Sequence, residues 1–346
     1  MAGNKNLNAA ARAKKDKFYT QLEDIENELR HYREFFAGKV VLCNCDDPFE
    51  SNFFKYFAAK FNDLELKKLI CTSYADSPIA GLELNLFPDG KTAYMVEVTE
   101  LKDWNGDGGE DLEDVAFAIE HGIYRKQPLT GDLNYCAGDF RSAELVNLLR
   151  QADVVVTNPP FSVFREFVAQ LIAYDKKFLI IGNINSITYK EIFPLIMANK
   201  LWLGYGMGRA ISGFIVPDDY ELYGTEARIK DGQRIVSTNQ CLWYTNIETP
   251  KRYWELDLWK EYSPDEYPRY DNYDAIEVSK TDHIPCDYFG VMGVPITFLD
   301  KYNPEQFELL GCTYSYGDCG CHVAGTDWNA YLNGKRMFKR LFIRRR

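Results

Sequence analysis

The feature that most constrains the fold is a short apolar run that ends abruptly at two prolines. Three valines at positions 154–156 lead through Thr157 into Asn158, Pro159, Pro160 and Phe161. An unbroken β-branched run is typical of a strand that is buried on both faces of a parallel sheet. Proline cannot donate a hydrogen bond to a neighbouring strand, so the strand must stop at this corner.

The same corner has a distinctive polar chemistry. Asn158 precedes a proline and is pushed toward extended geometry, and the two prolines have no N–H, so acceptors outnumber donors. In open α/β sheets, ligands bind beyond the carboxyl ends of the strands. The Asn158 side-chain oxygen and the Pro159 carbonyl can each accept one proton of a planar amino group. The Phe161 ring offers a flat apolar face on which a planar base can stack, a contact worth roughly 1–3 kcal/mol per base. A plain strand-ending turn with a core phenylalanine is the structural alternative.

Strand-like and helix-like segments alternate over the first two thirds of the chain. Alternation of this kind predicts an α/β fold with a doubly wound, mostly parallel sheet. The helix at 20–36 begins with a capping box, Thr20 with Glu23, and a hairpin of residues 81–87 and 92–98 interrupts the pattern. The predicted strands are 39–43, 66–72, 154–156, 177–181 and 201–203, and the predicted helices are 20–36, 51–61, 141–151, 163–174 and 189–198.

Length and texture predict two regions. The chain has 346 residues, more than one typical domain. From about residue 213 the pattern changes to short β-like pieces, many aromatic residues, and frequent proline and glycine. We therefore predict an α/β domain at residues 1–212 and a second, β-rich or mixed region at residues 213–346.

Composition limits the environment of the chain. No apolar segment is long enough to span a membrane, and the polar N-terminus has no apolar signal core, so a cytoplasmic protein without a membrane partner is expected. Nine cysteines without a framework spacing fit reduced thiols better than disulfides.

The charge is unevenly distributed. The net charge is −11, but the last twelve residues carry a cluster of cations that includes Lys335, Arg336, Lys339 and Arg340. Clustered cations suit the phosphate backbone of nucleic acid. A solvated terminal strand or helix is the alternative.

Two acidic loops resemble parts of a ligand site. Asp46, Asp47 and Pro48 follow the first predicted strand, and Asp139 with Phe140 precedes the helix at 141–151. Acidic and aromatic neighbours suit a cationic sulfonium ligand. Both loops can equally be ordinary helix caps.

Metal sites are weaker candidates. The segment from Asp103 to Asp114 matches a calcium-binding EF-hand loop at several positions, but it has Asp where the bidentate Glu belongs and no helix before it. Cys312, Cys319, Cys321 and His322 lack the paired spacing of a zinc site. We predict no metal centre, and leave the Asp103 to Asp114 loop open.

Taken together, the motifs resemble those of adenine-specific DNA methyltransferases, most closely the EcoRI-type modification methylases. The order also matches the class in which cofactor motifs precede the catalytic motif and target recognition comes last. The resemblance thus implies that residues 1–212 form the cofactor-binding catalytic domain and residues 213–346 the DNA target-recognition region. The similarity covers nearly the whole chain, at residues 18–21, 32–34, 44–48, 51–57, 138–142, 155–162, 178–183, 189–194, 292–298, 303–307 and 333–335.

The resemblance implies an enzyme that uses S-adenosyl-L-methionine to methylate the exocyclic amino nitrogen of adenine in a specific double-stranded DNA sequence. The base would be flipped into the corner at residues 158–161. By carry-over, Asn158, Pro159, Pro160 and Phe161 engage the base. Tyr19 and Thr20 help to enclose the cofactor, Asp46, Asp47 and Pro48 form its loop, and Asp139 and Phe140 contact its adenine moiety.

The chain departs from the wider superfamily in two places. Glu50, Ser51 and Asn52 stand where a glycine-rich loop is usual, so which of Asp46 and Asp47 touches the cofactor is open. The second strand ends without an acidic residue, so the partner of the cofactor ribose is not identified.

The resemblance also implies a biological setting: restriction-modification or phage self-protection, with a cognate endonuclease as a candidate partner and a monomer or weak dimer as the expected state. RNA adenine or protein glutamine as the acceptor, and a catalytically silent DNA-binding anti-restriction protein, are the alternatives. The recognised DNA sequence cannot be derived from the residues.

Overall fold

The computed structural model describes residues 19–45, 47–48, 51–74, 93–207, 211–216, 227–230, 232–236, 240–313 and 320–346. The chain divides into two compact units, the first made of residues 1–182 and 208–247 and the second of residues 183–207 and 248–346. Each unit is thus built from two separate stretches, and this division differs from the single boundary expected near residue 213. The functional roles assigned to the two regions remain predictions.

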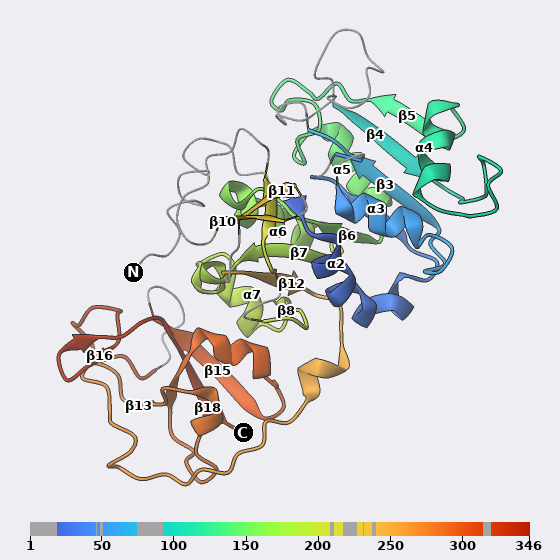
Figure 1. The fold of residues 1–346 in the computed structure, drawn as a ribbon. Coiled ribbons are helices and arrows are strands. Elements are labelled where there is room, and N and C mark those ends of the chain that lie inside the picture. Colours follow the sequence, from blue (N-terminus) through green and yellow to red (C-terminus); the bar gives the residue numbers. More distant parts are fainter. Residues whose placement is uncertain are drawn as a thin grey trace. The chain divides into compact units, whose positions relative to one another are not determined.

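The first unit is built on a large sheet whose order within the unit is β5-β4-β3-β2-β6-β7-β12 (Figure 1). Strands β3, β2, β6 and β7 pair in parallel. Strand β4 is antiparallel to both of its neighbours, β3 and β5. The sheet is therefore mixed in direction. Its strands are β2 (Val40–Cys43), β3 (Lys68–Thr72), β4 (Tyr94–Val98), β5 (Arg125–Pro128), β6 (Val154–Thr157), β7 (Lys177–Asn183) and β12 (Cys241–Thr245).

The predicted strand of three valines is confirmed as β6, and Val154, Val155 and Val156 are fully buried. Its predicted neighbours in the parallel core also form, because apolar β-branched residues favour a two-sided burial. Strand β12 joins this unit although its residues fall in the predicted recognition region. Of the predicted hairpin, the second arm appears as β4, and residues 81–87 lie outside the described part of the chain.

Four helices of the first unit lie close to predicted positions, whereas α4 was not predicted. Ser51 caps α3, and its hydroxyl accepts a hydrogen bond from the Phe53 backbone N–H at 3.1 Å. The helices are α2 (Leu22–Leu29), α3 (Asn52–Ala59), α4 (Leu112–Glu120), α5 (Ala143–Gln151) and α6 (Phe164–Ala173), with 3₁₀ turns η1 (Arg30–Phe36) and η2 (Phe161–Val163).

The predicted capping box at Thr20 is wrong. Gln21 is the residue before α2 and makes no side-chain cap, and Thr20 lies in the short strand β1 (Tyr19–Thr20). Strand β1 pairs antiparallel with β9 (Phe214–Val216), in a sheet that also holds β10 (Ala227–Lys230) and β11 (Gln233–Val236). Pairing with a strand almost two hundred residues away keeps Thr20 extended, so it cannot cap the helix.

The second unit has its own sheet, with the order β13-β14-β18-β15, and an aromatic core around Tyr270, Tyr273 and Phe342. The rings of Tyr273 and Phe342 stack with centroids 4.3 Å apart. The strands of the second unit are β8 (Trp202–Leu203), β13 (Ile276–Glu277), β14 (Met292–Pro295), β15 (Phe307–Cys312), β16 (Tyr331–Leu332), β17 (Lys335–Arg336) and β18 (Arg340–Arg345). Its helical segments are η3 (Ile184–Thr188), α7 (Phe193–Met197), η4 (Pro250–Tyr253), η5 (Thr281–His283) and η6 (Ile296–Lys301).

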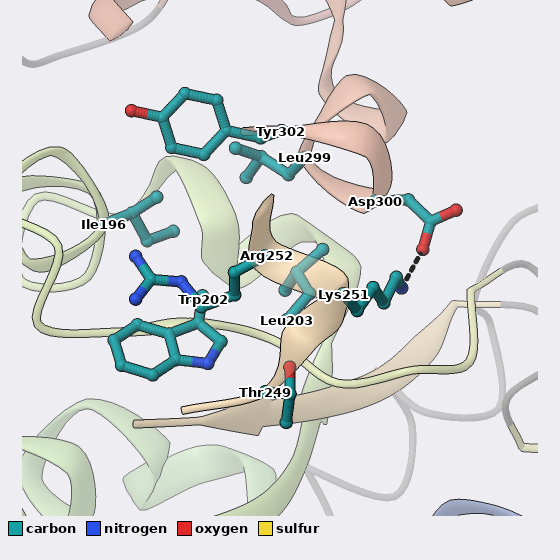
Figure 2. Close-up of a pocket in the computed structure, with 9 residues that line it drawn as sticks. All are labelled: Ile196, Trp202, Leu203, Thr249, Lys251, Arg252, Leu299, Asp300 and Tyr302. Atoms are coloured by element: carbon teal, nitrogen blue, oxygen red, sulfur yellow. Dashed lines mark hydrogen bonds and ion pairs between the residues drawn. The ribbon is translucent and has the colours of Figure 1, made fainter. Parts of the chain in front are cut away.

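A small, partly open pocket lies within the second unit (Figure 2). The Lys251 ammonium at its rim is 2.5 Å from the Asp300 carboxylate and also donates to the backbone carbonyls of Gly204 and Tyr205. The Arg252 guanidinium stacks over the Trp202 ring at 3.6 Å and forms an ion pair with Glu248. Lys251 and Arg252 thus have partners within the second unit, and these contacts hold residues 248–252 in place.

Composition led to two expectations, that no segment spans a membrane and that the cysteines are reduced. No helix within the described residues is both long and apolar enough to cross a membrane. Seven described cysteines form no disulfide, but Cys321 is disulfide-bonded, so the expectation of reduced thiols fails for this residue.

Candidate active site

The candidate site lies where neighbouring strands of the main sheet end. Strands β2 and β6 are adjacent and parallel, with Val41 opposite Val154 and Leu42 opposite Val155. The chain moves from β2 to β3 on one side and reaches β6 on the other, which makes this a topological switch point. The loop that carries Asp47 and the corner at Asn158 therefore leave the same edge of the sheet.

The corner that follows β6 leads directly into η2 and α6. Pro159 is buried, Asn158 and Phe161 are half-buried, and the Val163 N–H donates to the Pro160 carbonyl at 3.1 Å. The Phe161 ring lies 6.1 Å from the Phe214 ring, measured between centroids. The corner thus combines a stiff backbone with a ring that is only partly covered.

Strand β1 carries Tyr19 and Thr20, the residues that the sequence predicts to enclose a cofactor. Thr20 lies opposite Phe214, whose ring contacts Phe161. The Thr20 carbonyl accepts a hydrogen bond from the Asn52 side chain at 2.8 Å. The pairing of β1 with β9 therefore brings Tyr19 and Thr20 close to the corner.

Two buried hydroxyl groups fit a polar ligand. Thr20 is 3% exposed and Thr72, the last residue of β3, is fully buried. Within the described residues, neither Oγ1 atom has a hydrogen-bond partner. A buried polar atom usually has a partner, so these hydroxyls are candidate contacts for a bound polar molecule.

The loop after β2 places Asp47 in a buried polar setting. Asp47 is 4% exposed and accepts a hydrogen bond from the Tyr94 hydroxyl at 3.0 Å. The Lys126 ammonium lies over the Tyr94 ring, 4.5 Å from its centroid. Burial lowers the pKa of Lys126, and Asp47 opposes that shift. Pro48 is buried as well, and Asp46 lies outside the described residues.

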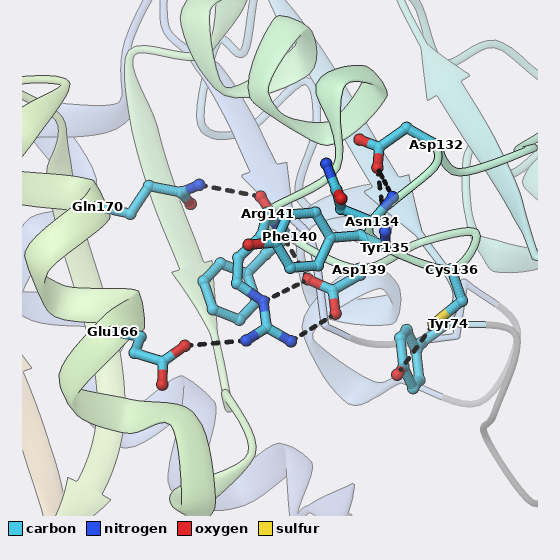
Figure 3. Close-up of polar contacts among 10 residues, drawn as sticks. All are labelled: Tyr74, Asp132, Asn134, Tyr135, Cys136, Asp139, Phe140, Arg141, Glu166 and Gln170. Carbon is cyan, nitrogen blue, oxygen red and sulfur yellow. Dashed lines mark hydrogen bonds and ion pairs between the residues drawn. The ribbon is translucent and has the colours of Figure 1, made fainter.

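The second acidic turn packs against the end of β3. Gly138 has φ +80°, and a Cβ at this position would lie 2.0 Å from the Ser73 carbonyl oxygen. Only glycine allows this approach. Asp139 and Phe140 are both 6% exposed, and Arg141 forms an ion pair with Asp139 at 2.8 Å (Figure 3). The turn therefore lies beside the carboxyl end of a strand that neighbours β2.

The acidic loop with the EF-hand pattern forms a structural turn. Asp103, Asp107 and Asp114 do cluster, but their carboxylates accept hydrogen bonds from the loop itself. Asp114 accepts from the backbone N–H groups of Trp104, Asn105 and Asp111, and it forms the capping box of α4 with Asp111. These hydrogen bonds close the loop and fix the start of α4.

A pH-dependent stability effect follows at Asp114. The N–H of Asn105 lowers the pKa of Asp114 from its ordinary value of 3.8, helped by Asp111 and Trp104 and opposed by burial. We expect Asp114→Asn to lower the melting temperature at pH 7 by several degrees, because an amide NH₂ would face a backbone donor. Because the pKa of Asp114 is lower in the folded state than its ordinary value, its carboxylate stabilises the fold above pH 3.8. This contribution is lost as pH falls through the folded-state pKa.

Thermal unfolding of wild type and variant from pH 7 to pH 3 measures this effect. The exposed neighbour Glu113 provides the control, since Glu113→Gln should leave the melting curve unchanged. A deficit that stays constant down to pH 3 would contradict the assignment.

The basic C-terminal residues do not form one exposed cluster. Arg340 is buried and its guanidinium pairs with Glu277 at 2.7 Å, so the interpretation of Arg340 as a phosphate contact is wrong. The Lys339 ammonium is half-buried and donates to the Thr188 hydroxyl at 2.7 Å, and burial lowers its pKa. Lys335 and Arg336 are exposed on β17.

Comparison with known proteins places the chain in a family. The sequence profile of the family described as adenine-specific methyltransferase EcoRI matches residues 6–346. The chain belongs to this family. It is 53% identical to the Type II methyltransferase M.EcoRI of Escherichia coli over 315 residues, which cover 89% of each protein.

Two mycoplasma relatives align over almost the full length of the chain. The chain is 35% identical to the Type II methyltransferase M.MgeORF184P of Mycoplasma genitalium and 36% identical to M.MpnI of Mycoplasma pneumoniae, with 98% of each protein covered. No solved structure matches. Family membership identifies the chain as an enzyme, a site-specific adenine-specific DNA methyltransferase.

Some residues around the site were not predicted. Phe214 reaches the corner through the pairing of β1 with β9, and no local pattern indicates that. Tyr94 lies on a strand that was recognised, but its contact with Asp47 spans 47 residues. Arg141 lies in the segment 138–142 that resembles the family, and its position two residues after Asp139 was the available signal for a local ion pair.

Proposed function

We propose that this enzyme transfers a methyl group from S-adenosylmethionine to the exocyclic amino nitrogen of adenine in a specific double-stranded DNA sequence. The observation that carries the proposal is the position of the corner at residues 158–161. It follows β6 at the topological switch point, next to the loop that follows β2. A base inside a duplex cannot enter such a corner, so the target adenine is flipped out of the helix.

The corner prepares the amino group for reaction. The Asn158 side-chain oxygen and the Pro159 carbonyl accept its two protons, which localises the nitrogen lone pair outside the ring. Phe161 stacks on the base and offsets part of the cost of flipping. S-adenosylmethionine, when bound, supplies an electrophilic methyl group. Positioning and the two acceptors carry the catalysis, and the methylated nitrogen then loses a proton to water without a dedicated base.

The cofactor is held by the residues around the neighbouring strand ends. Tyr19 and Thr20 of β1 enclose it, and Asp46, Asp47 and Pro48 form the loop beneath it. Asp139 and Phe140 contact its adenine moiety. The Thr20 and Thr72 hydroxyls support this assignment, because both are buried and have no hydrogen-bond partner within the described residues.

DNA recognition is assigned to the C-terminal region. Lys335 and Arg336 are its best phosphate contacts, since both are exposed and lie on adjacent residues of β17. The biological setting that fits is Type II restriction-modification, with a nuclease of the same specificity as partner. RNA adenine and protein glutamine also present a planar NH₂ and serve as control acceptors.

Labelled methyl transfer tests the proposal. The full-length protein is incubated with methyl-labelled S-adenosylmethionine and, separately, with duplex DNA, RNA and protein. We expect label in N6-methyladenine of DNA alone. Transfer to RNA or protein but not to DNA would overturn the substrate, and DNA binding without any cofactor binding would favour a silent anti-restriction protein.

A further inference from the structure

The ion-pair network around Arg141 suggests a role beyond holding the turn together. Figure 3 shows Arg141 between Asp139 of the turn and Glu166 of α6. We propose that Arg141 is a positioning residue that aims the Asp139 carboxylate at the adenine amino group of the cofactor. The inference rests on the proposed function, since it requires S-adenosylmethionine to bind at this turn.

Among the residues that the structure describes, the hydrogen bonds of Asp139 leave one acceptor position open. Its Oδ1 accepts from the Arg141 backbone N–H at 2.9 Å and from Arg141 Nε at 3.0 Å. Its Oδ2 accepts from Arg141 Nη2 at 2.8 Å. A carboxylate has about four acceptor positions, two on each oxygen. Oδ1 is therefore filled, and Oδ2 retains a single position for one further donor.

Arg141 itself is fixed from several sides. Its Nη1 donates to Glu166 at 2.9 Å, and its guanidinium lies 5.2 Å from the Phe140 ring centroid and 4.8 Å from that of Tyr135. The hydrogen bonds to Asp139 raise the pKa of Arg141, so it is always charged. The planar fork of arginine holds a carboxylate in one orientation, which lysine cannot do.

Helix α6 holds the same turn through neighbouring positions. Gln170 donates from its side chain to the Phe140 carbonyl at 3.0 Å, and the Phe167 ring packs edge-on against Phe140 with centroids 5.0 Å apart. Together with Glu166 these residues lie at positions i, i+1 and i+4 of the helix that follows the catalytic corner. The turn, and with it Asp139, therefore has a fixed place relative to that corner.

The acceptor left on Oδ2 predicts selectivity for an amino group. A ligand that donates from this position gains a hydrogen bond to a charged partner, whereas a carbonyl oxygen there would face a carboxylate. S-adenosylhomocysteine and S-inosylhomocysteine differ at this point, because the second carries an oxygen in place of the amino group. A residue that only stabilises the fold would change the affinity for both ligands equally.

Calorimetric titration of the full-length protein with each ligand tests the inference. We expect wild type to prefer S-adenosylhomocysteine by at least about tenfold, the typical value of a hydrogen bond to a charged group. In Arg141→Met the preference should fall below about threefold, because the carboxylate is no longer aimed. Arg150→Met is the matched control, since Arg150 is an exposed residue on α5, and it should keep the full preference.

A second variant covers the case in which Arg141→Met does not fold. Arg141→Lys keeps the charge but not the fork, and it should also lose most of the preference, because its affinity for S-adenosylhomocysteine falls toward that for S-inosylhomocysteine. An unchanged preference in a folded variant, or equal affinity of wild type for the two ligands, would overturn the inference. Failure of wild type to bind either ligand would instead overturn the proposed function, so the two failures can be told apart.

Discussion

Asn158→Ala is expected to lower the rate of DNA methylation by about 10²- to 10³-fold while leaving cofactor affinity within a factor of about two. Removal of one preorganised polar group at a reacting centre typically costs a factor of this size. Asn158 lies in the corner after β6, and the residues assigned to the cofactor lie on other elements. Single-turnover methylation of duplex DNA and calorimetry with S-adenosylhomocysteine measure the two quantities separately.

The control for this variant is Asn147→Ala. Asn147 is an exposed asparagine on α5, so its loss should change neither the methylation rate nor cofactor binding. If Asn158→Ala methylated DNA at the wild-type rate, the corner would have no catalytic role. A parallel loss of cofactor affinity would assign Asn158 to the cofactor rather than to the base.

Arg340→Met is expected to destabilise the second unit by about 3–5 kcal/mol, because it leaves a carboxylate buried without its counter-ion. Side chains of Arg340 and Glu277 are 9% and 5% exposed, and Tyr270 also donates its hydroxyl to Glu277. Burial lowers the pKa of Arg340, but hydrogen bonds to Glu277 outweigh this effect and raise it. Urea unfolding followed by tryptophan fluorescence measures the loss.

The same strand offers a matched control. Arg344 pairs with Glu308 at 2.8 Å, but these side chains are 46% and 40% exposed. Arg344→Met should therefore cost less than about 1 kcal/mol. Adding Glu277→Gln to Arg340→Met should recover much of the loss, since a neutral amide replaces the unpaired charge. Equal losses for the two arginine variants would contradict a special role of the buried pair.

The corner at residues 158–161 and the strand before it could be predicted because their causes are local. Three consecutive valines favour a two-sided burial, and two prolines end the hydrogen-bonding ladder wherever the strand is placed. The cap of α3 by Ser51 is local in the same way. The parallel core of the sheet followed from the alternation of such segments.

Residues that act through distant partners could not be placed in this way. Thr20 fits a helix cap in sequence, yet it forms a strand because it pairs with Phe214. Arg340 belongs to a basic run in sequence, yet it is buried because Glu277 lies opposite in the folded unit. In both cases the local pattern was compatible with two structures, and the energy of a long-range contact selected one.

The sequence by itself determined the chemistry that this protein carries, because the residue types at Asn158 to Phe161 and in the acidic loops define what they can accept or donate. The tertiary structure decided which of these groups meet. The parallel pairing of β2 with β6 brings the Asp47 loop and the corner to one edge of the sheet, and α6 fixes the turn at Asp139 through Arg141. Strand pairing and side-chain contacts join residues distant in sequence, so only the folded chain defines them.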